Sequence, residues 1–191
     1  MILGSHNTMT YLPVKQWYFK PLFWTARCQA KTLAEQFEAG VRLFDFRVRF
    51  DENGDLTFAH GPIKFKGSVY SSINYLNILA KTVDEPIYAR VILESNSKMK
   101  DQDLQEEHFR YFCESLEEDY KRITFFGGNR KYDWKKIYDF KTEEPSLDDK
   151  YSSTTKWLPI DDIWPWLYAK FNNKKNLNNG TDKDVLFIDF I

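Results

Sequence analysis

The sequence has little of what defines several common protein classes. Among its 191 residues are only two cysteines, Cys28 and Cys113, and only three histidines. Two cysteines do not make a disulfide framework in a chain of this size, so we expect both thiols to be reduced. The 27 basic and 28 acidic side chains give a formal charge of −1 and form no basic stripe. Nucleic acid is therefore not an expected partner.

Long apolar segments are also missing. No run approaches the roughly 18 apolar residues that cross a bilayer. The first residues show neither the basic segment nor the apolar core of a signal peptide, and a proline already follows at position 13. The sequence therefore predicts a cytoplasmic protein, at most peripheral to a membrane.

What the chain does contain is ample material for a core. Hydrophobic residues make up 42% of the sequence and aromatic residues 17%. Neither an internal repeat nor a low-complexity tract divides the chain. We therefore expect a single domain over residues 1–191.

Strand and helix patterns alternate along the chain, which is typical of an α/β protein. Apolar residues at helical spacing predict helices over residues 72–83 and 101–120. A capping-box pattern from Thr32 to Glu35 predicts the start of a shorter helix, which ends at Gly40. Residues 10–31 show no such pattern and are expected to form a long aromatic loop.

The strand at residues 41–50 has the most informative pattern. Period-two alternation places Asp45, Arg47 and Arg49 on one face and bulky apolar side chains on the other. An Asn-Gly turn at 53–54 then returns the chain as a hairpin toward residue 60. A charged strand face is costly to bury unless its charges are paired or bind an anion. A structural ion pair and an anion site are both consistent with this face.

Two of the three histidines follow short strands. His6 lies in Gly-Ser-His-Asn-Thr at 4–8, where an apolar run gives way to small polar residues, and His60 precedes a Gly-Pro breaker. A single histidine at a strand end is most often a bystander, but two of them with an Asp-x-Arg pair between them indicate acid/base chemistry on a phosphate diester. His108 falls on the acidic face of a predicted helix, and we expect it to be a surface residue.

These segments resemble the catalytic X region of phosphatidylinositol-specific phospholipase C, in its bacterial rather than its eukaryotic form. The resemblance rests on Gly-Ser-His-Asn-Thr at 4–8, Gly-Val-Arg-Leu-Phe-Asp-Phe-Arg at 40–47, Phe-Ala-His-Gly-Pro at 58–62 and the final strand at 185–191. It is strong over residues 1–62 and rests on element order beyond them. It implies a TIM-type (β/α) barrel, which is expected to be small and distorted or incomplete because a full barrel typically needs ~250 residues.

The resemblance also implies catalytic roles. His6 would be the general base, His60 the general acid, Arg47 the cation beside the phosphate, and Asp189 the partner that orients His6. Asp45 is our candidate for the carboxylate that keeps His60 charged. In the expected reaction, the inositol 2-hydroxyl of phosphatidylinositol or a related inositol phosphodiester attacks the phosphorus, releasing diacylglycerol and a cyclic inositol phosphate.

Four further residues are candidates for substrate binding: Asn7, Arg90, Glu94 and Arg130. Arg90 and Glu94 share a face of the strand predicted at 87–94, where a mutual salt bridge is the alternative. Arg130 follows two glycines in a loop. The Asp-Phe-Arg pattern at 45–47 favours catalysis without a cofactor, and the alternative is calcium held by the oxygen donors Asn7, Asp45 and Glu94.

An aromatic segment at residues 17–24 follows His6 and is flanked by lysine and arginine. This mixture suits peripheral contact with a membrane, and packing over the barrel mouth is the alternative. Two other functions are considered. A glycerophosphodiesterase-like hydrolase would carry a His-Arg opening and a Glu-x-Asp metal site, which we do not find. A non-catalytic barrel that binds inositol phosphates or lipid would not need a matched acid and base.

Overall fold

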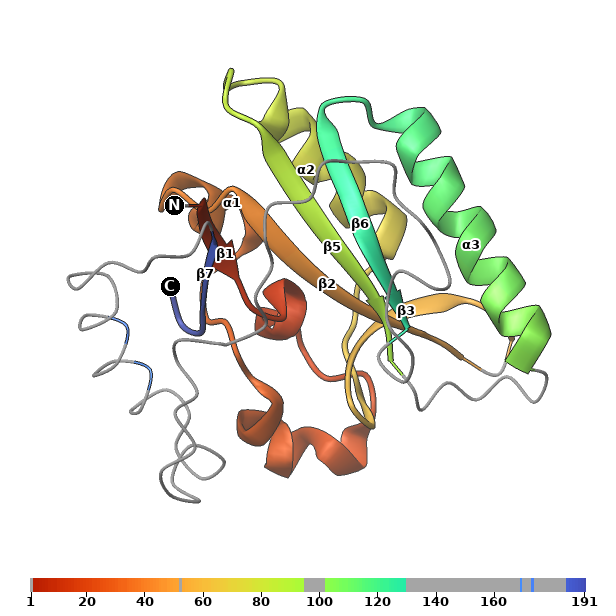
Figure 1. Ribbon diagram of the computed structural model, residues 1–191. Helices are drawn as coiled ribbons and strands as arrows, with labels where there is room; N and C mark the ends of the chain where they lie inside the picture. The colour runs from red at the N-terminus through yellow and green to blue at the C-terminus, as the bar shows by residue number, and fades with distance from the viewer. Residues whose placement is uncertain (1, 52, 95–101, 130–168, 170–172, 174–184) are drawn as a thin grey trace.

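The computed structural model describes residues 2–51, 53–94, 102–129, 169, 173 and 185–191. Its strands are β1 (Ile2–Ser5), β2 (Leu43–Phe50), β3 (Leu56–His60), β4 (Ile63–Lys64), β5 (Ile87–Leu93), β6 (Ile123–Asn129) and β7 (Val185–Ile188). Its α-helices are α1 (Leu33–Glu38), α2 (Val69–Ala80) and α3 (Gln102–Asp119), and two 3₁₀ segments are η1 (Thr8–Tyr11) and η2 (Trp17–Ala26). The predicted α/β class is confirmed (Figure 1).

Five parallel strands form the body of one sheet, in the order β7-β1-β2-β5-β6. β1 pairs with the start of β2, whereas the hairpin strand β3 runs antiparallel to the last residues of β2, Val48 to Phe50. Within the described ranges no strand joins β6 to β7, so this sheet is not closed (Figure 1). The structure therefore confirms a distorted or incomplete barrel.

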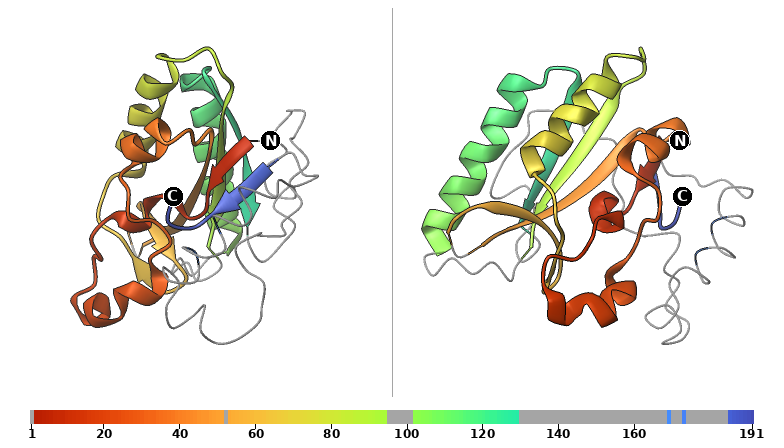
Figure 2. Two further views of the ribbon diagram at one scale, coloured as in Figure 1. Left: turned by 90° about the vertical axis from the view of Figure 1, so that its left-hand side faces the viewer. Right: turned by 180° about the vertical axis from the view of Figure 1, so that it is seen from behind.

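The three α-helices lie on one face of the sheet, as the views from the side and from behind show (Figure 2). The apolar face of β2 packs toward them, with Phe44 stacked on Phe37 of α1 at 6.4 Å between ring centroids. Phe44, Phe46 and Val48 are fully buried. The opposite face of β2 carries the charged residues and is buried as well, so it lies in the interior of the incomplete barrel.

Local capping explains where the helices begin. Thr32 and Glu35 form the predicted capping box at α1. α2 begins at Val69 rather than at residue 72, because the Ser68 side chain accepts a hydrogen bond from the Ser71 backbone N–H and caps the helix earlier. The loop expected over residues 10–31 is partly wrong, since it contains the 3₁₀ segments η1 and η2. None of the described helices combines the length and apolarity needed to span a membrane.

Candidate active site

Strand register brings four candidate residues to one level of the sheet. β1 pairs with both β2 and β7 up to Ser5, so the next residues along the three strands, His6, Asp45 and Asp189, lie side by side. Asp45 is paired in turn with Arg90 of β5. Because these strands are parallel, residues far apart in sequence meet at one row near the carboxyl ends of β1 and β7. This is the rim where barrel enzymes place their catalytic groups.

His6 uses both of its ring nitrogens. Nδ1 lies 2.7 Å from Asp189 Oδ1, and Nε2 lies 2.8 Å from Arg47 Nη2. A guanidinium group can only donate, so Nε2 accepts and the ring proton belongs on Nδ1, which donates to Asp189. The side chains of His6 and Asp189 are 13% and 14% exposed. The predicted pairing of Asp189 with His6 is therefore present, and it directs the lone pair of Nε2 toward Arg47.

Asp45 is the anchor of the buried charges. It is fully buried, and its oxygens accept hydrogen bonds from Arg47 Nε at 3.1 Å, Arg90 Nε at 3.0 Å and the Asn7 backbone N–H at 3.0 Å. Burial alone would raise the pKa of Asp45, but the guanidinium groups of Arg90 and Arg47 outweigh burial and hold this pKa below its usual range. Glu94 adds a second buried carboxylate, 3.6 Å from Arg47 Nη1. The charged face of β2 is thus compensated inside the barrel.

His60 faces His6 across a short gap. The ring centroids are 6.5 Å apart and the ring planes meet at 77°. His60 Nδ1 lies 2.9 Å from the Ala26 carbonyl oxygen, so Nδ1 is a donor and Nε2 is the nitrogen left for other partners. Burial lowers the pKa of His60, and it outweighs the hydrogen bond to Ala26, which favours the protonated ring.

The expectation that Asp45 keeps His60 charged is wrong. Both Asp45 oxygens accept hydrogen bonds from arginines, and the side-chain partner expected for His60 is replaced by the backbone of Ala26. The reason is the geometry of the hairpin. It returns His60 to the Ala26 carbonyl, 2.9 Å from Nδ1, whereas Asp45 is held by Arg47 and Arg90.

The oxygen donors considered for calcium do not form a cation site. The Asp45 carboxylate lies between two guanidinium groups, and Asn7 approaches it with a backbone N–H rather than a side-chain oxygen. Glu94 lies beside Arg47. A divalent cation at this place would sit among fixed positive charges. The donor set therefore does not fit calcium.

Two buried donors are left without a partner in the part of the chain that the structure describes, Asn7 Nδ2 and Arg49 Nε. Asn7 directly follows His6 and has a left-handed backbone with φ 45°, a conformation that asparagine tolerates. Arg49 donates through Nη1 to the carbonyl of Gly61 at 3.1 Å, which places it beside His60. Buried donors of this kind are costly unless a ligand or water accepts from them. We therefore add Arg49 to the candidate site.

Gln29 is a further site residue that no sequence pattern indicated. It is fully buried, and its Nε2 donates to the carbonyls of His6 at 3.0 Å and Ile188 at 2.9 Å. Its Oε1 accepts from the backbone N–H of Ile191 at 3.3 Å. Gln29 thus joins the end of β1 to the end of β7 and positions His6 relative to Asp189.

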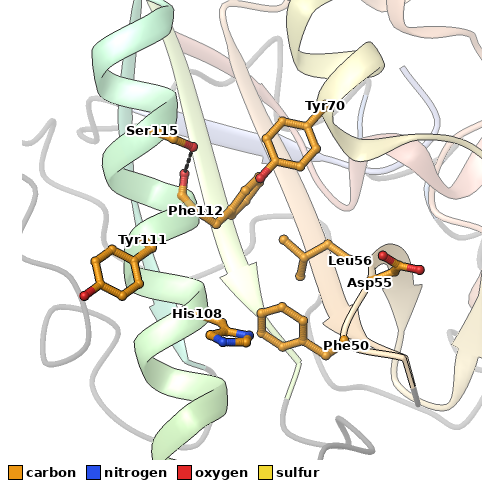
Figure 3. A pocket seen from close by; sticks show the side chains of 9 residues that line it. Phe50, Asp55, Leu56, Tyr70, His108, Tyr111, Phe112 and Ser115 are labelled. Carbon is orange, nitrogen blue, oxygen red and sulfur yellow. Dashed lines mark hydrogen bonds between the residues drawn. The ribbon is translucent and has the colours of Figure 1, made fainter.

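An apolar cavity of about 310 Å³ adjoins His60, with Phe19, Leu22 and Ala26 of η2 among its lining residues. A larger cavity of about 420 Å³ lies elsewhere, between α3 and the β2-β3 hairpin (Figure 3). Its lining includes Tyr70 and His108, which is exposed on α3 as expected, and none of the candidate site residues. The smaller cavity therefore belongs to the candidate site, and the larger one does not.

The structure thus assembles eight of the nine predicted site residues into one charged cluster: His6, His60, Arg47, Asp45, Asp189, Asn7, Arg90 and Glu94. Arg130, the ninth, lies outside the described residues.

Comparison with known proteins agrees with the expected resemblance. No protein-family model matches the chain. A 1-phosphatidylinositol phosphodiesterase of Listeria monocytogenes is 35% identical to it over 98 residues, which are 50% of this chain and 29% of that protein. The chain therefore matches less than a third of this curated relative.

Two solved structures share the fold over 99% of the chain. The phosphatidylinositol-specific phospholipase C of Listeria monocytogenes superposes with a TM-score of 0.59 at 15% identity and is 87% covered. A variant of the Staphylococcus aureus phosphatidylinositol-specific phospholipase C superposes with a TM-score of 0.63 at 16% identity and is 84% covered. The chain is thus similar to the bacterial phospholipases C in local sequence and in fold.

Replacing Gln29 with leucine should lower the free energy of unfolding by about 2–4 kcal/mol, because the carbonyls of His6 and Ile188 each lose a donor and the Ile191 N–H loses its acceptor. Urea unfolding followed by circular dichroism measures this loss. Gln16→Leu is the matched control. Gln16 donates to the carbonyl of Pro62 at an exposed place and accepts from the Lys64 N–H at a half-buried one, so water can replace much of what is lost and the cost should be about 1 kcal/mol. Equal losses in the two variants would contradict the role given to Gln29.

Proposed function

We propose that this chain is a phosphoric diester lyase or hydrolase that cleaves phosphatidylinositol or a related inositol phosphodiester. The observation that carries the proposal is the pair of imidazoles, His6 and His60, that face each other at 6.5 Å with Arg47 bound to one of them. The Listeria protein to which the chain is similar is named a 1-phosphatidylinositol phosphodiesterase, which supports the substrate class.

His6 serves as the general base. Its Nε2 takes the proton of the inositol 2-hydroxyl, while Asp189 holds the proton on Nδ1 and stabilises the imidazolium that forms. The hydroxyl oxygen then forms a bond to the phosphorus of the same molecule, and the bond from phosphorus to the diacylglycerol oxygen breaks. Attack from within one molecule supplies the proximity advantage that an external water lacks.

Arg47 serves as the cation beside the phosphate. Its Nε and Nη1 are held by Asp45 and Glu94, so Nη2 is the edge that turns from His6 to a nonbridging oxygen when substrate binds. This exchange also frees Nε2 of His6 to act as a base. Asn7 Nδ2 and Arg49 Nε offer two further donors to the phosphate or to inositol hydroxyls.

His60 serves as the general acid. Burial disfavours its protonated form in the free protein, and the negative phosphodiester favours that form once substrate is bound. Since Nδ1 donates to Ala26, Nε2 is the nitrogen that protonates the departing diacylglycerol oxygen. The apolar cavity beside His60 lies where this leaving group would be.

Catalysis proceeds without calcium in this proposal. Arg47 already supplies a fixed positive charge next to His6, at the place where a metal would otherwise act on the phosphate. Asp45 is already paired with two guanidinium groups and a backbone N–H. Its oxygens therefore do not join Asn7 and Glu94 in the coordination shell that calcium requires.

We further propose that η2 contacts the membrane that holds the substrate. The exposed fractions are 77% for Trp17, 56% for Tyr18 and 51% for Leu22, and η2 also lines the cavity beside His60. This exposure favours contact with lipid over packing across the barrel mouth, since interfacial aromatic side chains partition to the headgroup level. A cytoplasmic location stays a prediction.

Product analysis tests the reaction. Incubated with phosphatidylinositol in the presence of EDTA, the protein should release diacylglycerol and a cyclic inositol phosphate, which phosphorus NMR detects. His6→Ala and His60→Ala should each lower kcat by about 10² to 10⁴-fold, the usual contribution of a general base or acid. His108→Ala is the matched control and should leave kcat unchanged.

Three outcomes would count against the proposal. A loss of only a fewfold in either histidine variant would remove that histidine from its role. Binding of inositol phosphate without turnover would favour the non-catalytic barrel. Activity that EDTA abolishes and calcium restores would contradict the metal-free mechanism.

The pH profile should report His60. The free protein must hold a proton on His60, and the pKa of this group is lowered by burial, so kcat/KM should fall as pH rises through a value below the ordinary 6.5. The corresponding limb of kcat should lie at higher pH, because the bound phosphodiester favours protonated His60. An alkaline limb of kcat/KM above the ordinary value would contradict this assignment.

Vesicle binding tests the membrane contact. Trp17→Ala combined with Trp24→Ala should weaken binding to vesicles of phosphatidylinositol and phosphatidylcholine by about tenfold or more, because two rings no longer leave water. Tyr111→Ala is the control, since Tyr111 is 57% exposed on α3 rather than on η2. Unchanged vesicle binding in the double variant would rule out η2 as the contact.

A further inference from the structure

The thiol of Cys28 lies inside the candidate site but takes no part in the proposed reaction. Its Sγ is 3.9 Å from His60 Nδ1, and the side chain is 7% exposed. Burial, reinforced by the negative charge of Asp189, raises the pKa of the Cys28 thiol well above its usual range. Without a partner that favours the thiolate, this sulfur therefore stays protonated and inert.

Cys28 forms a cluster of three different donor types with two residues of the site. The Sγ of Cys28, a ring nitrogen of His6 and a carboxylate oxygen of Asp189 all lie within 4.8 Å of one another. Thiolate sulfur, imidazole nitrogen and carboxylate oxygen are the three ligand types that Zn²⁺ takes from proteins. Tetrahedral zinc holds its donors roughly 3.5 Å apart, so the cluster closes on a metal with about 1 Å of side-chain movement.

The backbone holds these three donors together before any metal binds. The Phe190 N–H donates to the carbonyl of Cys28 at 2.7 Å, and the His6 N–H donates to the carbonyl of Ile188 at 3.1 Å. Gln29 bridges the same segments with its side-chain amide. The cluster is therefore largely preorganised, although its members lie far apart in sequence.

We propose that His6, Cys28 and Asp189 bind a thiophilic divalent cation such as Zn²⁺, with water in the fourth position, and that this metal reversibly inhibits the enzyme. The inhibition, though not the binding, rests on the proposed function. The Cys28 thiol loses its proton to solvent as the sulfur–metal bond forms. The proton on Nδ1 of His6 moves to Nε2, so that the lone pair of Nδ1 binds the metal.

The moved proton explains the inhibition. With Nε2 protonated, His6 has no lone pair to take the proton of the inositol 2-hydroxyl, and Asp189 is held by the metal. The contact of Nε2 with Arg47 is also lost, which weakens binding relative to a structural zinc site. The negative charges of the Cys28 thiolate and Asp189 offset the nearby guanidinium, which lies at the opposite edge of the ring.

The donor set predicts metal selectivity. Zn²⁺ and Cd²⁺ accept sulfur and nitrogen ligands, whereas Mg²⁺ and Ca²⁺ require mostly oxygen donors. Inhibition should therefore appear with Zn²⁺ and Cd²⁺ and be absent with Mg²⁺ and Ca²⁺ at the same concentration.

Two cysteine variants form a matched pair for the activity test. Micromolar free Zn²⁺ should lower the wild-type rate by about tenfold or more, and a chelator should restore it. Cys28→Ser should keep its basal rate and lose most of this inhibition. Cys113→Ser, which changes a fully buried thiol of α3, should remain as sensitive as the wild type. Equal inhibition of wild type and Cys28→Ser would overturn the proposal.

Metal binding is measured without substrate, so this experiment tests the metal site even if the protein does not cleave phosphatidylinositol. Cd²⁺ added to the whole protein should give an ultraviolet thiolate-to-cadmium band in the wild type and in Cys113→Ser, but not in Cys28→Ser. His6→Ala should weaken Cd²⁺ binding by about tenfold. Because this variant retains the Cys28 thiol, it tests the site even if Cys28→Ser does not fold. Absence of the band from the wild type, or an unchanged affinity in His6→Ala, would refute the site.

Discussion

The Asp45 carboxylate, buried between Arg47 and Arg90, is the interaction on which the rest of the site depends. Without this negative charge, Arg47 and Arg90 would each lose a buried carboxylate partner, at a cost of several kcal/mol. Asp45 also accepts the backbone N–H of Asn7, so it fixes the turn that directly follows His6. One carboxylate therefore positions His6, the proposed general base, and the cation beside it, and the parallel register of β1, β2 and β5 brings these groups together.

The two imidazoles of the site have different surroundings, and the roles proposed for them follow from this difference. His6 lies between a carboxylate and a guanidinium, which fixes its tautomer and leaves Nε2 as the basic nitrogen. His60 lies against an apolar cavity and a backbone carbonyl, and in the proposed reaction the phosphodiester completes its electrostatic environment. The difference in environment, and not the residue type, distinguishes the proposed base from the proposed acid. The proximity of Cys28 and Asp189 to His6 is also the basis of the proposed metal site.

Much of this arrangement was predictable because it leaves a periodic pattern or a motif in the sequence. The alternation of residues 43–50 predicted both faces of β2, and the two strand-end histidines predicted a shared site. Other features have no local signal. Gln29 lies in an irregular segment, and its role arises only when β1 and β7 meet. The partner of His60 is a backbone carbonyl, which no residue type reveals. Arg49 belonged to the predicted charged face but gained a role only when its Nε was found without a partner.

The tautomer of His6 tests the central claim most directly, because the arginine, the imidazole and the carboxylate must form one hydrogen-bonded chain. Nitrogen-15 correlation NMR of the imidazole groups at neutral pH distinguishes a proton on Nδ1 from one on Nε2. The account predicts that His6 carries its proton on Nδ1, hydrogen-bonded to Asp189, and that Asp45→Asn, by loosening Arg47, reduces the population of this tautomer. A His6 proton found on Nε2 in the wild-type protein would contradict the account.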